Sequence, residues 1–189
     1  MANTDRAHGL ASLGVTLAGG PVQLFPYTKD ASESGAIFVN DLVNQETDGF
    51  VEAASISAGT TLNLGVNFGP YVPANAAAKV ILVNIDPNAL YEAQDDASNG
   101  PALSTPGLSR GDMGLNANVV YATGDLATGI SKTEIAASTA AVTAGLDLKL
   151  LGLLDVFDPL TGAKNAFGAW ARIVVMINNS TFKLPATGL

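Results

Sequence analysis

The sequence lacks cysteine and contains a single histidine, His8. Disulfides, thiolate metal sites and cysteine nucleophiles are therefore excluded. Zinc catalysis needs three protein ligands, which a chain with one histidine and no cysteine does not readily supply. A Ser/His/Asp triad would have to use His8, which is more simply interpreted as a surface histidine. The sequence also lacks a glycine motif that would bind phosphate or a dinucleotide. We therefore predict a protein that is not an enzyme, with no catalytic residues, no metal site and no cofactor.

Charge is also sparse, since Asp, Glu, Lys and Arg together make up 14% of the chain. The 17 acidic residues outnumber the 9 Lys and Arg residues, and the formal net charge of −8 repels phosphate backbones, so nucleic acid is not an expected partner. The longest apolar runs, such as 79–85 and 173–177, are far shorter than the roughly 20 residues of a membrane-spanning helix. Residues 1–10 lack the apolar stretch of a signal peptide. We expect a soluble protein made in the cytoplasm.

The sequence does contain a series of short β-like segments. The clearest covers residues 60–68, where Leu62, Leu64, Val66 and Phe68 alternate with small or polar residues. The unbroken apolar run 80–83 is expected to be a strand buried on both faces. Residues 86–94 begin a helical turn or form a strand with Ala89, Tyr91 and Ala93 on one side. Further strands are predicted at 36–43, 49–55, 115–123, 146–150 and 169–177.

Glycine, proline, asparagine and aspartate separate these segments, which is typical of a barrel or sandwich. We predict a mainly β protein with a single β-rich domain over residues 28–189 and at most one or two short helices, one of them near 132–136. Residues 1–27 contain several glycines and prolines, which favour an extended N-terminal arm. We expect this arm to pack on a neighbouring subunit after assembly.

Two groups of residues are candidates for contact with a partner. Trp170 and Arg172 share one face of a predicted strand. They form either an interface anchor or a core tryptophan with the arginine along its edge. Asp5, Arg6 and His8 carry the charges of the predicted arm. The long loop 95–114 is a further contact element.

Two functions of other classes remain open. The tryptophan and tyrosines would suit a carbohydrate-binding β-module, as rings that stack on sugars: Trp170, Tyr27, Tyr71, Tyr91 and Tyr121. The acidic segment that contains Glu92 and Asp95 would allow an acid-pair hydrolase. A solvated acidic loop, or at best a weak Ca²⁺ site, is the simpler interpretation of that segment.

The chain resembles a family of small tailed-bacteriophage virion proteins encoded among head genes, and the resemblance extends over nearly the whole length. Its most distinctive part is residues 86–94, Asp-Pro-Asn-Ala-Leu-Tyr-Glu-Ala-Gln, which is similar to an Asp-Pro-Asp-Ala-Leu-Phe-Glu-Val-Gln block. The chain departs from the family at Ile85 and Ser180. The other matching segments follow in the family's order: 2–6, Gly9, Leu10, Gly14, 83–84, 114–117, 128–131, 148–153, 169–170 and 177–179.

This resemblance implies a virion structural protein, specifically a capsid decoration or cement protein on the outside of a phage head. It implies a β-barrel or tulip-like body, a homotrimer, the major capsid protein as partner, and a location on the capsid surface after synthesis in the host cytoplasm. A tail or neck component is the alternative within the same broad class. No catalytic or ligand-binding residues follow from the resemblance.

Overall fold

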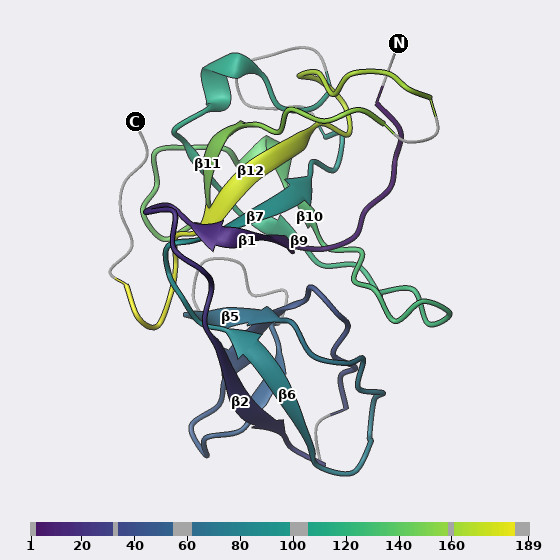
Figure 1. Cartoon of the computed structure of the whole chain (residues 1–189), viewed down its shortest axis with the longest axis vertical. Helices are drawn as coiled ribbons and strands as arrows, with labels where there is room; N and C mark the ends of the chain where they lie inside the picture. Colours follow the sequence, from purple (N-terminus) through teal and green to yellow (C-terminus); the bar gives the residue numbers. More distant parts are fainter. Residues whose placement is uncertain (1–2, 32–33, 55–61, 99–105, 159–160, 184–189) are drawn as a thin grey trace.

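The protein is mainly β, as predicted, and contains a closed five-stranded barrel. The computed structural model describes residues 3–31, 34–54, 62–98, 106–158 and 161–183. The strands form two lobes, one above the other in Figure 1. In the described ranges the helical elements are two three-residue 3-10 helices, η1 (Arg110–Asp112) and η2 (Ala137–Thr139). No helix in these ranges is long and apolar enough to cross a membrane.

The first lobe is built on an antiparallel five-stranded sheet with the order β1-β7-β12-β11-β8. A second sheet pairs β9 with β10. Tyr91, at the centre of β7, is fully buried among aliphatic side chains from the neighbouring strands. The bounds are β1 (Ala11–Thr16), β7 (Ala89–Gln94), β8 (Asn116–Ala117), β9 (Val119–Val120), β10 (Glu134–Ile135), β11 (Leu148–Leu153) and β12 (Arg172–Ile177).

The second lobe is the barrel, with the strand order β2-β4-β3-β5-β6. A parallel contact between Lys29 of β2 and Val51 of β4 closes it. Its interior is a separate cluster of aliphatic side chains that includes Leu64, Ile81 and Val83. The bounds are β2 (Leu24–Lys29), β3 (Leu42–Gln45), β4 (Val51–Ala53), β5 (Asn63–Asn67) and β6 (Lys79–Asn84).

The two lobes meet at a junction of polar and apolar contacts. Asn63 of the barrel donates its side-chain amide to the buried Asp147 carboxylate of the sheet lobe at 3.0 Å. Leu42 and Val66, from β3 and β5, pack into the core cluster of the sheet lobe. Because barrel side chains complete the other lobe's core, we expect the two lobes to unfold together.

The predicted N-terminal arm is wrong as an element outside the domain. Residues 11–16 form β1, which pairs with β7, and residues 24–29 form β2, which pairs with β6 along its whole length. Leu10 is fully buried in the core of the sheet lobe. Gly19, Gly20 and Pro21 lie between β1 and β2, where the chain passes from one lobe to the other, whereas Gly14 and Pro26 lie within those strands.

The predictions for individual strands, the short helix and the contact loop have different outcomes. Residues 89–94 are a strand with Ala89, Tyr91 and Ala93 buried on one face, so the strand interpretation is confirmed. Strand β6 is not buried on both faces, because Val80 is 60% exposed whereas Ile81 is fully buried. The helix expected near 132–136 is instead β10 followed by η2. Part of the predicted contact loop, 99–105, lies outside the described residues.

Candidate functional site

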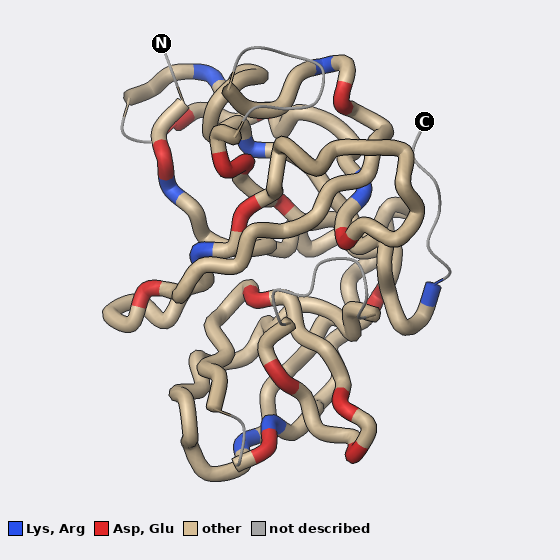
Figure 2. Tube along the Cα trace, turned by 180° about the vertical axis from the view of Figure 1, so that it is seen from behind, with Lys and Arg blue, Asp and Glu red and all other residues tan. Residues whose placement is uncertain are grey.

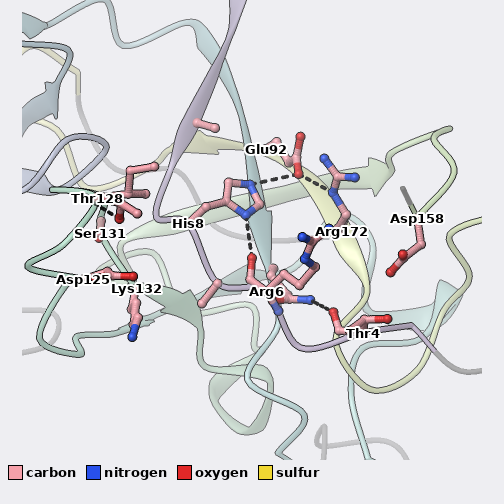
Figure 3. Close-up of a pocket in the computed structure, with 14 residues that line it drawn as sticks. Thr4, Arg6, His8, Glu92, Asp125, Thr128, Ser131, Lys132, Asp158 and Arg172 are labelled. Carbon is pink, nitrogen blue, oxygen red and sulfur yellow. Dashed lines mark hydrogen bonds and ion pairs between the residues drawn. The ribbon is translucent and has the colours of Figure 1, made fainter. Parts of the chain in front are cut away.

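An open pocket of about 590 Å³ lies where residues 4–8 cross the sheet lobe (Figure 3). Its walls come from five parts of the chain: the N-terminal segment, β7, β12, the loop at 125–132 and the loop at 158. Most of its lining side chains are polar or charged. The lining residues are Thr4, Arg6, Ala7, His8, Ala11, Glu92, Gln94, Asp125, Thr128, Ile130, Ser131, Lys132, Asp158 and Arg172.

One wall of the pocket is an ion-pair group formed by His8, Glu92 and Arg172. The Nε2 atom of His8 lies 2.9 Å from Oε1 of Glu92, and Nε of Arg172 donates to the same oxygen. Strands β7 and β12 are paired neighbours, with Glu92 opposite Val174 and Arg172 opposite Gln94, so both side chains emerge on one face. The Glu92 side chain is only 9% exposed.

Both ring nitrogens of His8 face oxygen acceptors. Nδ1 lies 2.9 Å from the backbone carbonyl of Arg6, and Nε2 faces the Glu92 carboxylate. Only the imidazolium form donates from both nitrogens. The hydrogen bond with Glu92 raises the pKa of His8 despite burial, which lowers it. Burial raises the pKa of Glu92, but hydrogen bonds and charge attraction from His8 and Arg172 together outweigh burial and lower that pKa to about 2.

Replacing Glu92 with glutamine should destabilise the protein by about 2 kcal/mol at pH 6, because His8 and Arg172 lose a partly buried anionic acceptor. The pKa of His8 should fall toward its unperturbed value. Because the native pKa of His8 is raised, the stabilisation is complete below the unfolded pKa of about 6.5 and is lost as the pH rises through the raised pKa. Glu92→Gln should weaken this pH dependence.

Urea unfolding at several pH values measures the stability, and NMR titration of the only imidazole measures the pKa of His8. The matched control is Glu52→Gln, which removes a carboxylate from strand β4 of the other lobe. An unchanged His8 pKa in Glu92→Gln would show that the pair does not hold the imidazolium.

The N-terminal segment is held in place by side chains of the body. Gln94 accepts a hydrogen bond from the backbone N–H of Arg6 at 2.7 Å and donates to the carbonyls of Thr4, at 2.7 Å, and Trp170. Asn40 donates to the carbonyl of His8 at 3.0 Å. These bonds fix the backbone on both sides of Arg6, so the cationic side chain is presented from a defined position.

Three of the five predicted interaction residues, Arg6, His8 and Arg172, line this one pocket. Asp5 does not line it, and its charge contributes, after burial, to raising the pKa of Glu134 to about 7. Trp170 precedes β12 with a positive φ of 57°, so the strand alternation that would place it beside Arg172 does not reach it. The backbone carbonyl of Trp170 accepts a hydrogen bond from the side chain of Gln94, which lines the pocket.

The two carboxylates of the acid-pair hypothesis serve different contacts. Glu92 and Asp95 are three residues apart in extended chain, so their side chains point to opposite faces. Glu92 is held in the ion pairs, whereas Asp95 is fully buried and accepts backbone N–H groups from Ala97, Leu108, Trp170 and Ala171. Asp95 therefore connects three chain segments, and the geometry does not place the two acids around one substrate bond.

The aromatic residues of the carbohydrate hypothesis are dispersed. Tyr91 is fully buried in the sheet lobe, and Tyr121 packs against the same core. Tyr27 packs against the barrel core, and Tyr71 stacks on Phe38 with ring centroids 4.9 Å apart. None of these tyrosines lines the pocket. The structure does not bring these rings together into a platform for sugars.

The sequence contained a signal for one part of the pocket and not for the rest. If Ala89, Tyr91 and Ala93 face the core, alternation places Glu92 and Gln94 together on the other face of the strand. The sequence around Asp125 and Lys132 contains no such pattern that would place them at the pocket. They reach the pocket because a turn, bridged between Asp125 and Ile130, folds back toward the N-terminal segment.

Within the described residues, no group of three or more His, Asp or Glu side chains is arranged to hold a metal ion. No protein-family model, curated protein or solved structure matches the chain.

Proposed function

We propose that the protein is a structural component of a tailed-phage virion, bound to the outside of the head, where it stabilises contacts between major capsid subunits. The sequence resemblance supports the phage assignment, through the block at residues 86–94 above all. The structural observation that carries the proposal is an apolar outer surface on the barrel. That surface is suited to contact with another protein.

This apolar surface lies on strands β2 and β6. Val80 and Leu82 of β6 point outward and are 60% and 42% exposed. The register places Pro26 opposite Leu82, and directly opposite residues share a face of an antiparallel pair. Leu24, on the same face of β2 as Pro26, and Phe68, whose backbone N–H bonds the carbonyl of Leu82, add further exposed apolar area. Neighbouring exposed apolar side chains mark protein contact surfaces in soluble proteins.

We also propose that the protein acts as a homotrimer. A closed three-fold ring repeats one interface in each subunit and matches the three-fold positions of a capsid. The low share of charged residues, 14%, supports burial of surface between subunits. The pocket with Arg6 and Arg172 lies on the other lobe from the apolar surface, so one subunit presents two chemically different faces.

Replacing Val80 with lysine should weaken binding to the head by at least about tenfold, because a charge would enter an apolar contact without a partner. Purified wild-type and variant proteins are added to heads from a phage that lacks the gene, and bound protein is measured after sedimentation. Leu126→Lys is the matched control, since Leu126 is 70% exposed in the turn at 126–129 of the other lobe.

If Val80→Lys and wild type bind heads equally, the apolar barrel surface is not part of the interface with the head. Binding of wild type to tails or necks, with none to heads, would favour the alternative virion position.

A further inference from the structure

The pocket gathers one third of the Lys and Arg residues of an acidic protein. Three of the nine Lys and Arg residues, Arg6, Lys132 and Arg172, line it together with the only histidine. Figure 2 shows that the other basic residues are spread over both lobes, with acidic residues between them. Such a concentration in a chain of net charge −8 makes the local potential differ from that of the whole protein.

Two guanidinium groups in the pocket have unused donors. Arg172 spends its Nε on Glu92, and among the described residues no hydrogen bond joins its two terminal nitrogens to another group. Arg6 is exposed, and in the same ranges its guanidinium makes no hydrogen bond or ion pair. A guanidinium presents a planar fork of N–H donors that fits a carboxylate. The backbone bonds from Gln94 hold Arg6 at the pocket without using this fork.

The charge balance of the lining discriminates between kinds of anion. Arg6, Lys132, Arg172 and the imidazolium of His8 are four positive charges, and the three acidic lining residues, Glu92, Asp125 and Asp158, are negative. The pocket therefore carries a net charge of about +1. A monoanion neutralises it, whereas a phosphate dianion leaves an excess negative charge beside the three carboxylates.

We propose that this pocket is a binding site for a single carboxylate group, held by the guanidinium groups of Arg6 and Arg172. Figure 3 shows Asp125 and Lys132 on one side of the pocket and Asp158 on the other, with Arg6, His8 and Arg172 between them. The carboxylate comes from a small organic acid or from an acidic residue of a polypeptide. The proposal stands on the pocket alone and does not depend on the virion role.

Binding of a carboxylate should depend on pH, because His8 carries one of the positive charges of the lining. The groups that face His8 are Arg6 on its own segment, Glu92 on β7, Arg172 on β12, and Asp125 and Lys132 across the pocket. When His8 loses its proton the lining becomes neutral overall. Carboxylate affinity should therefore fall as the pH rises through the titration of His8.

The test is an NMR titration of the full chain with acetate at constant ionic strength. The only histidine gives a single set of imidazole signals, which reports directly from the pocket. We expect a saturable shift in the wild type and about tenfold or greater weakening in Arg6→Ala. His8 bonds the backbone carbonyl of Arg6, so Arg6→Ala keeps that contact. Arg110→Ala, which removes an exposed arginine outside the pocket, should bind as wild type does.

Two further titrations identify the source and the charge of the ligand. A blocked tripeptide with one central aspartate should bind at least as tightly as acetate if a polypeptide supplies the carboxylate, and more weakly if a free acid does. At the same pH, chosen so that phosphate is mainly a dianion, inorganic phosphate should bind more weakly than acetate. The proposal is overturned by a shift that does not saturate with acetate or the peptide, by equal affinity in Arg6→Ala and wild type, or by tighter binding of phosphate.

Discussion

Replacing Gly65 with alanine should destabilise the protein by about 3 kcal/mol or more, the largest effect that we expect from a single methyl group. Gly65 lies in β5 of the barrel, in a buried position. A Cβ atom there would lie 2.1 Å from the backbone carbonyl oxygen of Asn84 on β6. Because that neighbour is backbone, relief requires a strand of the closed barrel to move.

Gly152→Ala is the matched control, since Gly152 lies in β11 of the other lobe and a Cβ there would contact nothing within 4 Å. This control should be neutral or more stable by about 0.5 kcal/mol, because alanine restricts the unfolded chain. Urea unfolding followed by circular dichroism measures both variants. Similar stability of the two would contradict the close approach of β5 and β6.

Replacing Leu10 with alanine should destabilise the protein by about 3 kcal/mol, because the removed methyl groups leave a cavity in the core of the sheet lobe. Leu10 is fully buried, just before β1. For a domain of this size the melting temperature should fall by roughly 6–12 °C. Leu17→Ala is the control, because Leu17 is 60% exposed, and its effect should stay within about 0.5 kcal/mol.

This comparison also separates two views of the N-terminal segment. An arm outside the domain would make Leu10 as tolerant as Leu17. The structure instead gives Leu10 a core position and a backbone hydrogen bond from its N–H to Asn40 at 3.0 Å. Equal melting temperatures of the two variants and wild type would restore the arm interpretation.

The mainly β fold was predictable because alternation and turn residues act locally. Strand β7 shows this, since period-two spacing placed Ala89, Tyr91 and Ala93 on one face, although a helical turn remained the alternative for this segment. The sequence predicted a barrel or a sandwich and did not distinguish the two. Its closure depends on contacts such as Lys29 with Val51, which join positions distant in sequence.

The N-terminal segment was predicted wrongly for a related reason. Its glycines and prolines indicate breaks between elements, and the short strands between those breaks gain their stability from partners elsewhere in the chain. The pocket was predictable in part: Arg6 and His8 were contact candidates as charges of the predicted arm, and Arg172 was one as a partner of Trp170 in an interface anchor. Their meeting was not predictable, since it requires β7 and β12 to pair beneath residues 4–8.

The central proposal is that this chain is an abundant structural protein of a phage head. Quantitative mass spectrometry of purified virions, from a phage whose genome carries the gene, tests this proposal most directly. The account predicts hundreds of copies per particle, in a fixed ratio to the major capsid protein. Virions that lack the chain would contradict the account, and a few tens of copies or fewer would move it from the head to the tail or neck.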